Sequence, residues 1–242
     1  NNVEVPEVAL DLDLTMGNLI FQADNDSMMI TGNGELSGVK TEIEWHENFT
    51  NIELYRRKYR LKAIVNDQDW REKLKLTFPP FNKSYTNGLI GADVTIKVSS
   101  DGSGELKANL DLKDTLITLP RLGWYKPGKI AADATIRATF LNDNFQAISK
   151  IVYKGGGLNL IANASFKSGG VLNQVNISHF KFGQTNVQAI LAPSSNPEKE
   201  GWNIHVSGKQ LDLIEWMANE DMGSEKTKGI PVIFSLNLDA IQ

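Results

Sequence analysis

Strict alternation of apolar and polar residues runs through most of this 242-residue chain and predicts β-strands. Successive side chains of a strand point to opposite sides, so each alternating run has one apolar face and one polar face. The clearest runs, named by their first and last apolar residues, are Val8–Leu14, Ala92–Val98, Leu106–Leu112, Ala132–Phe140, Leu158–Phe166, Trp202–Val206 and Val232–Leu238.

Short segments rich in turn residues separate these runs. Links of this length join antiparallel neighbours, whereas a parallel crossover needs a dozen or more residues. The sequence therefore predicts one all-β unit over residues 1–242, built as a large, curved, mainly antiparallel sheet of roughly a dozen strands. The expected turns are Asn33-Gly34, Asn87-Gly88, Asp101-Gly102-Ser103-Gly104, Asp143-Asn144, Gly155-Gly156-Gly157, Ser168-Gly169-Gly170 and Gly183.

Helical signals are confined to two short segments. Asp67–Leu74 begins with a residue type that caps helices. Gln210–Ala218 is apolar on more than one side, including Leu213 and Trp216, so we expect a short helix that borders or plugs the sheet. Residues 219–229 are charged and contain glycine, which indicates a flexible loop.

Composition excludes several classes of function. The hydrophobic share of 41% and the charged share of 22% are typical of a folded protein. A net charge of −4 and the lack of a strong basic cluster argue against a nucleic-acid partner. The densest basic run, Tyr55–Arg60, is expected to be the solvated face of a strand. Without cysteine the chain has no disulfides, thiolate metal sites or cysteine nucleophiles.

No catalytic or metal-binding motif emerges from the polar residues. His46, His179 and His205 lie far apart and have no histidine two or four residues away. Asp24-Asn25-Asp26 is similar to the start of a calcium loop, but Met28 and Met29 occupy the next ligand position and the glycine position. Gly155-Gly156-Gly157 precedes a strand rather than a helix, so it predicts a turn and not a phosphate loop. We therefore expect a protein that is not an enzyme and needs no cofactor.

The shared apolar face of so many strands must be covered. A dozen strands of about seven residues would present about 1,300 Å² of apolar surface, far more than soluble proteins leave bare. The sheet could form a sandwich, close into a barrel, or curl into a trough filled by a partner or a lipid. The residues expected to line such a groove are Val94, Ile96, Val98, Leu106, Leu110, Leu112, Ile136, Phe140, Leu158, Leu160, Phe166, Phe234 and Leu236.

The middle of the chain resembles the large AsmA-like proteins of Gram-negative bacterial envelopes, in particular their YhdP-type region. The likeness extends from about Trp45 to about Met217, and its most specific part is the Leu-Gly-Trp-x-Lys-Pro-Gly stretch. The segments that carry it are Tyr59-Arg60-Leu61, Asp67–Leu74, Gly88–Val98, Asp101-Gly102-Ser103-Gly104, Leu110-Asp111-Leu112, Leu119–Gly128, Val206-Ser207-Gly208 and Leu211-Asp212-Leu213.

This resemblance implies a segment of a longer protein that is anchored in the inner membrane and crosses the periplasm. Repeated curved β-sheet modules of the family form a continuous apolar groove linked to phospholipid transport between the inner and outer membranes. The implied partners are phospholipids or other acyl-chain lipids, neighbouring groove segments of the same parent chain, and membranes contacted through parts outside this segment. An acyl chain needs only an apolar, non-directional surface, so no fixed site motif is expected.

Two other hypotheses remain open at this point. The first is a non-catalytic scaffold or assembly factor of the outer envelope that carries no lipid. Lipid that co-purifies with the protein would distinguish the lipid-binding groove from this scaffold. The second is a sugar-active β-sandwich enzyme, which would need two carboxylates about 5 to 10 Å apart beside an apolar-rimmed cleft.

Overall fold

The computed structural model describes residues 5–9, 12–50, 54–76, 80–120, 123–142, 144–194, 201–212 and 232–241. They contain one short helix, α1 (Asp67–Glu72), and sixteen strands. The strands are β1 (Val5–Ala9), β2 (Leu12–Ala23), β3 (Ser27–Leu36), β4 (Val39–Asn48), β5 (Arg57–Asn66), β6 (Thr86–Val98), β7 (Ser103–Asp111), β8 (Thr115–Leu119), β9 (Trp124–Lys126), β10 (Ala132–Leu141), β11 (Asn144–Gly155), β12 (Leu158–Lys167), β13 (Val171–Phe182), β14 (Thr185–Pro193), β15 (Trp202–Leu211) and β16 (Val232–Ile241).

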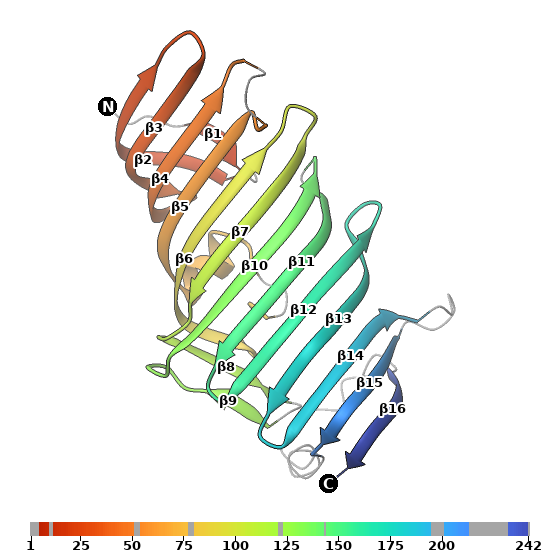
Figure 1. The fold of residues 1–242 in the computed structure, drawn as a ribbon. Coiled ribbons are helices and arrows are strands. Elements are labelled where there is room, and N and C mark those ends of the chain that lie inside the picture. Colours follow the sequence, from red (N-terminus) through yellow and green to blue (C-terminus); the bar gives the residue numbers. More distant parts are fainter. Residues whose placement is uncertain are drawn as a thin grey trace.

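The strands form a single open sheet (Figure 1). Its order follows the chain from β1 to β7, continues with β10 to β16, and leaves β8 and β9 as a side branch attached to β6. The predicted all-β fold with a large, mostly antiparallel sheet is confirmed. Because β1 and β16 lie at opposite ends of this order, the described strands do not close into a barrel. Nor is the sheet strongly curled.

Two expected turns lie inside strands instead. Asn33-Gly34 belongs to β3 and Asn87-Gly88 to β6. Both glycines serve close packing: a Cβ on Gly34 would lie 2.9 Å from Leu14 Cδ1, and one on Gly88 would lie 2.6 Å from the carbonyl oxygen of Asp114. The turn between β3 and β4 is Ser37-Gly38, where φ is positive at both residues, as a two-residue hairpin requires.

The last strand pair corrects the expectation that every link is short. β15 and β16 are parallel neighbours, with Val206 paired to Leu236. Residues 212–231 connect them, which is long enough for the chain to return to the starting end of β15. The first run, Val8–Leu14, is also divided, because Ala9 and Leu12 pair across β1 and β2.

The predicted first helix is present as α1, and the cap lies one residue earlier than expected. The Asn66 side chain accepts a hydrogen bond from the Asp69 amide at 2.8 Å. The second expected helix, Gln210–Ala218, is wrong at its start, since Gln210 and Leu211 end β15. The rest of that helix and the expected loop 219–229 lie outside the described residues.

Register shifts keep apolar residues on one side where strict alternation fails. In β11, Ile148 pairs with Ala138 and Ile151 pairs with Ile136, although they are three residues apart. A β-bulge at the two intervening residues absorbs the extra position. Similar shifts occur in β13 between Ile177 and Phe180. The sheet thus keeps one continuous apolar face.

Candidate functional site

The apolar face is organised in rows that run across the strands. Residues paired directly across neighbouring strands point to the same side of a sheet. One such row, which we call the central row, crosses β4 to β7 and β10 to β16 without a polar member. It consists of Ile43, Leu61, Val94, Ala108, Ile136, Ile151, Ala162, Ile177, Ala189, Val206 and Leu236.

A second apolar row lies beside it. It extends further, from β2 to β16, so the face is at least two rows deep over nearly the whole sheet. At about 4.8 Å between strands, the central row alone is about 48 Å long. The second row consists of Phe21, Ile30, Trp45, Tyr59, Ile96, Leu106, Ala138, Ile148, Ala164, Val175, Leu191, Ile204 and Phe234.

The structure places every predicted lining residue on this face, at different levels of exposure. Ile96, Leu112, Phe140 and Leu158 are buried within hydrophobic clusters. Those left partly exposed are Val94, Val98, Leu106, Leu110, Ile136, Leu160 and Phe166. Towards the C-terminal edge the face opens to solvent, where Phe234 is 49% and Leu236 is 48% exposed.

One end of the apolar face is covered by α1 together with β8 and β9. In Figure 1, α1 lies behind β6 and β7, and β8 and β9 lie at the lower edge of the sheet near the ends of β10 to β12. Trp70 of α1 and Trp124 of β9 pack into the same cluster as Ile90, Leu112 and Leu158. The Trp70 indole donates a hydrogen bond to the Phe81 carbonyl at 3.0 Å, so its polar atom is satisfied in this buried position.

The Leu-Gly-Trp-x-Lys-Pro-Gly stretch fastens this cap to the sheet. Trp124 Nε1 donates to the carbonyl of Gly156 at 3.0 Å, and its ring meets Tyr153 edge-on at 6.1 Å. The fully buried Lys126 donates from Nζ to three backbone carbonyls, at Lys113, Pro127 and Ile130. The three acceptors match the three donors of an ammonium group.

Burial also shifts the pKa of two ionisable groups, Lys126 of the cap and Tyr153 of the sheet. It lowers the pKa of Lys126, an effect that the nearby Asp114 and Asp111 oppose. Burial raises the pKa of Tyr153 to about 12, and Asp133 adds to the shift. The Tyr153 hydroxyl is buried, and none of the described residues is a hydrogen-bond partner for it.

Several lining residues escaped the sequence analysis. Phe145, whose ring lies 6.3 Å from that of Phe166, follows a turn and has no alternating context. Ile148, Ile151 and Ile177 were missed because the bulges interrupt the two-residue period. The sequence did contain a signal for such bulges, namely pairs of large apolar residues three positions apart within one strand.

The polar residues considered earlier do not converge on a site. His46, His179 and His205 lie on β4, β13 and β15. Asp24 shapes a turn by accepting hydrogen bonds from the amides of Asp26 and Ser27, which lower its pKa. Throughout the described part of the chain, no three His, Asp or Glu side chains are grouped closely enough to bind a metal ion. The same residues include no helix with the length and hydropathy to span a bilayer.

The fold defines a class of protein: a single open, mostly antiparallel β-sheet with one continuous apolar face. No family model matches the chain, and no curated protein or solved structure is significantly similar to it.

Proposed function

We propose that this protein binds the acyl chains of lipids along the apolar face of its sheet. The observation that carries the proposal is the pairing of apolar residues in two unbroken rows across eleven neighbouring strands or more. A hydrocarbon chain gains about 0.8 kcal/mol for each methylene that it buries, without directional contacts. The partly exposed Ile136 and the exposed Leu236 on this face provide such a surface.

The resemblance to AsmA-like proteins gives the proposal its biological setting. In that setting the chain is a non-catalytic segment of a longer periplasmic protein anchored in the inner membrane, and it supports phospholipid transport between the two membranes. Among the described strands β1 and β16 each have one neighbour, so segments of the parent chain would extend the sheet at these two edges.

Native mass spectrometry of the gently purified protein, followed by extraction and identification of bound lipid, tests this function. Ile136→Asp would place a charge in the central row and should strongly reduce bound lipid, because an unpaired charge against hydrocarbon costs several kcal/mol. Asn109→Asp on the polar face of β7 is the matched control and should leave lipid occupancy unchanged. Thermal unfolding of both variants separates loss of lipid from loss of folding.

Absence of lipid from the unmodified protein, together with no uptake from phospholipid vesicles, would contradict the proposal. That result would favour the scaffold alternative, in which the apolar face is covered by another protein segment.

A further inference from the structure

The polar face of the sheet carries a row of cations in adjacent register. Lys107 of β7 pairs directly with Arg137 of β10, and Arg137 pairs with Lys150 of β11. Like charges directly opposite each other destabilise a sheet. The centre of the sheet thus carries three cations that repel one another, although the net charge of the chain is −4.

Two other cations of this face have carboxylate partners. Arg60 donates to Asp93 at 3.1 Å, and Lys62 lies 3.3 Å from Glu42. Within the described residues, by contrast, no ion pair forms at Lys107, Arg137 or Lys150. The basic row therefore keeps its positive charge available for a ligand.

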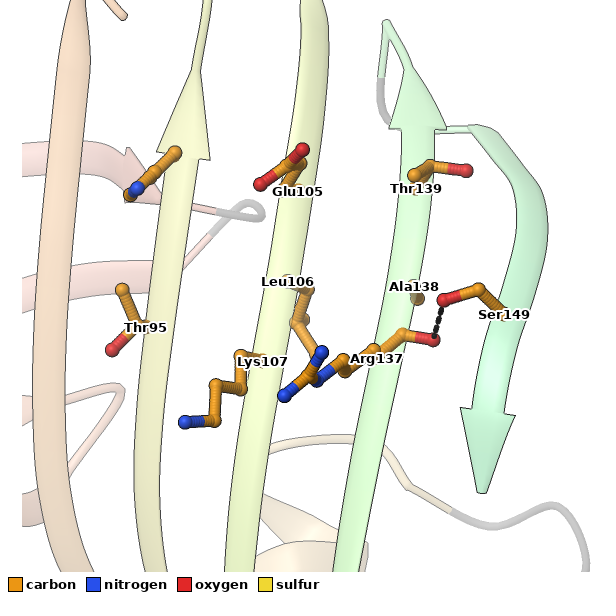
Figure 2. A pocket seen from close by; sticks show the side chains of 9 residues that line it. Thr95, Glu105, Leu106, Lys107, Arg137, Ala138, Thr139 and Ser149 are labelled. Carbon is orange, nitrogen blue, oxygen red and sulfur yellow. Dashed lines mark hydrogen bonds between the residues drawn. The ribbon is translucent and has the colours of Figure 1, made fainter. Parts of the chain in front are cut away.

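A hollow of about 420 Å³ lies over Lys107 and Arg137 of this row. Figure 2 shows the side chains that line it. Lys97, Lys107 and Arg137 line it, together with the acid Glu105. The hydroxyl groups of Thr95 and Thr139 add neutral hydrogen-bond donors to its wall, which Ser149 also lines. The hollow thus combines the charged donors of Lys97, Lys107 and Arg137 with neutral hydroxyl donors. This combination suits an oxyanion.

The bulge in β11 concentrates donors at this position. Since Ile148 and Ile151 both remain on the apolar face, the bulge turns Ser149 and Lys150 together towards Arg137. Ser149 Oγ donates to the Arg137 carbonyl at 3.3 Å, which fixes the bulged strand against β10 (Figure 2). Bulges of this kind re-aim side chains and are frequent beside functional sites.

From this geometry we infer that the hollow binds a phosphate group carrying two or more negative charges. The guanidinium of Arg137 matches phosphate oxygens with two parallel donors, and Lys107 and Lys150 flank it one strand away on either side. A multivalent anion would relieve the repulsion along the row. The site lies on the face opposite the apolar rows, so it is independent of acyl-chain binding there. The phosphate could belong to a soluble compound or to a lipid headgroup.

The test measures binding of inorganic pyrophosphate by calorimetry at low salt. The double variant Lys107→Gln, Arg137→Gln should bind at least about tenfold more weakly than the unmodified protein. The matched control is Arg60→Gln, Lys62→Gln, which removes the same charge from the same face and should retain binding. Arg137→Lys keeps the charge but loses the paired donors, so it should bind several-fold more weakly.

Sedimentation with vesicles separates the two sources of phosphate. Phosphatidylcholine vesicles with and without phosphatidic acid are compared for the unmodified protein and both double variants. Binding of phosphatidic-acid vesicles that depends on Lys107 and Arg137 identifies a headgroup site, and pyrophosphate binding alone identifies a soluble ligand. Failure of the unmodified protein to bind either probe, or equal loss of binding in the Arg60, Lys62 control, would overturn the inference.

Discussion

The ring of Phe140 lies over the backbone of Gly104, its direct partner across β7 and β10. A Cβ at position 104 would overlap the ring, so only glycine fits there. Phe140 is 5% exposed and belongs to the cluster that contains Ile96 and Tyr59. An aromatic ring that covers a strand glycine restores the packing that the missing side chain would have supplied.

Gly104→Ala should therefore destabilise the protein by about 1–3 kcal/mol, the usual cost of overpacking a core. Urea unfolding measures the change. Gly128→Ala is the control, because a Cβ there would have ordinary contacts only. Adding Phe140→Leu to Gly104→Ala should recover part of the loss; fully additive effects would show that the two residues do not interact.

Lys126→Met should destabilise the protein by about 2–4 kcal/mol. Methionine fills similar space but cannot donate, so the carbonyls of Pro127 and Ile130 lose this donor and that of Lys113 keeps only the Lys129 amide. Lys113→Met removes an exposed ammonium and should change the unfolding free energy by less than about 0.5 kcal/mol. Equal effects of the two substitutions would refute a structural role for the Lys126 ammonium.

Tyr153→Phe should alter stability in alkaline solution. The pKa of Tyr153 is raised from 10.0 to about 12 in the folded protein, so between these values the folded state holds a proton that the unfolded state has lost. The unmodified protein should therefore lose up to about 3 kcal/mol of stability from this residue as the pH rises from about 10 to about 12. Below pH 10 this contribution is fully present.

Chemical unfolding at pH 8, 10 and 11.5 measures the effect. The Phe variant should show a smaller decline than the unmodified protein, and Tyr125→Phe, which removes an exposed hydroxyl, should follow the unmodified protein. At neutral pH Tyr153→Phe should change stability little, because it removes a buried hydroxyl to which no described residue is hydrogen-bonded. Identical pH profiles for all three proteins would contradict the burial of Tyr153.

Deletion of Ser149 should remove the bulge of β11 without disrupting the sheet. Without this residue only Lys150 separates Ile148 from Ile151, so β11 would alternate regularly with both isoleucines on the apolar face. We expect a loss of about 1 kcal/mol in thermal or urea unfolding, since the register of both neighbouring strands is kept and the hydrogen bond to Arg137 is lost; a loss of several kcal/mol would show that the bulge itself is needed. Ser149→Ala keeps the bulge and loses only the hydrogen bond to Arg137, so it should cost no more than about 1 kcal/mol.

Alternation in the sequence was sufficient to predict the β class and the side to which most lining residues point. The period of two assigns Val94, Leu110 and Ile136 to the same face without knowledge of which strands are neighbours. The short turns that contain Gly102 and Gly156 likewise indicate antiparallel pairs of strands. These features are local, because side-chain direction and turn geometry depend only on nearby residues.

Long-range pairing decided what the sequence left open. The bulge that keeps Ile148 and Ile151 together, the parallel return of β16 and the open order of the sheet depend on partners far along the chain. The basic row at Lys107, Arg137 and Lys150 is likewise invisible in the sequence, because these residues are brought into register only by pairing of β7, β10 and β11. Register is set by the fit of whole faces against one another, a property that no single segment contains.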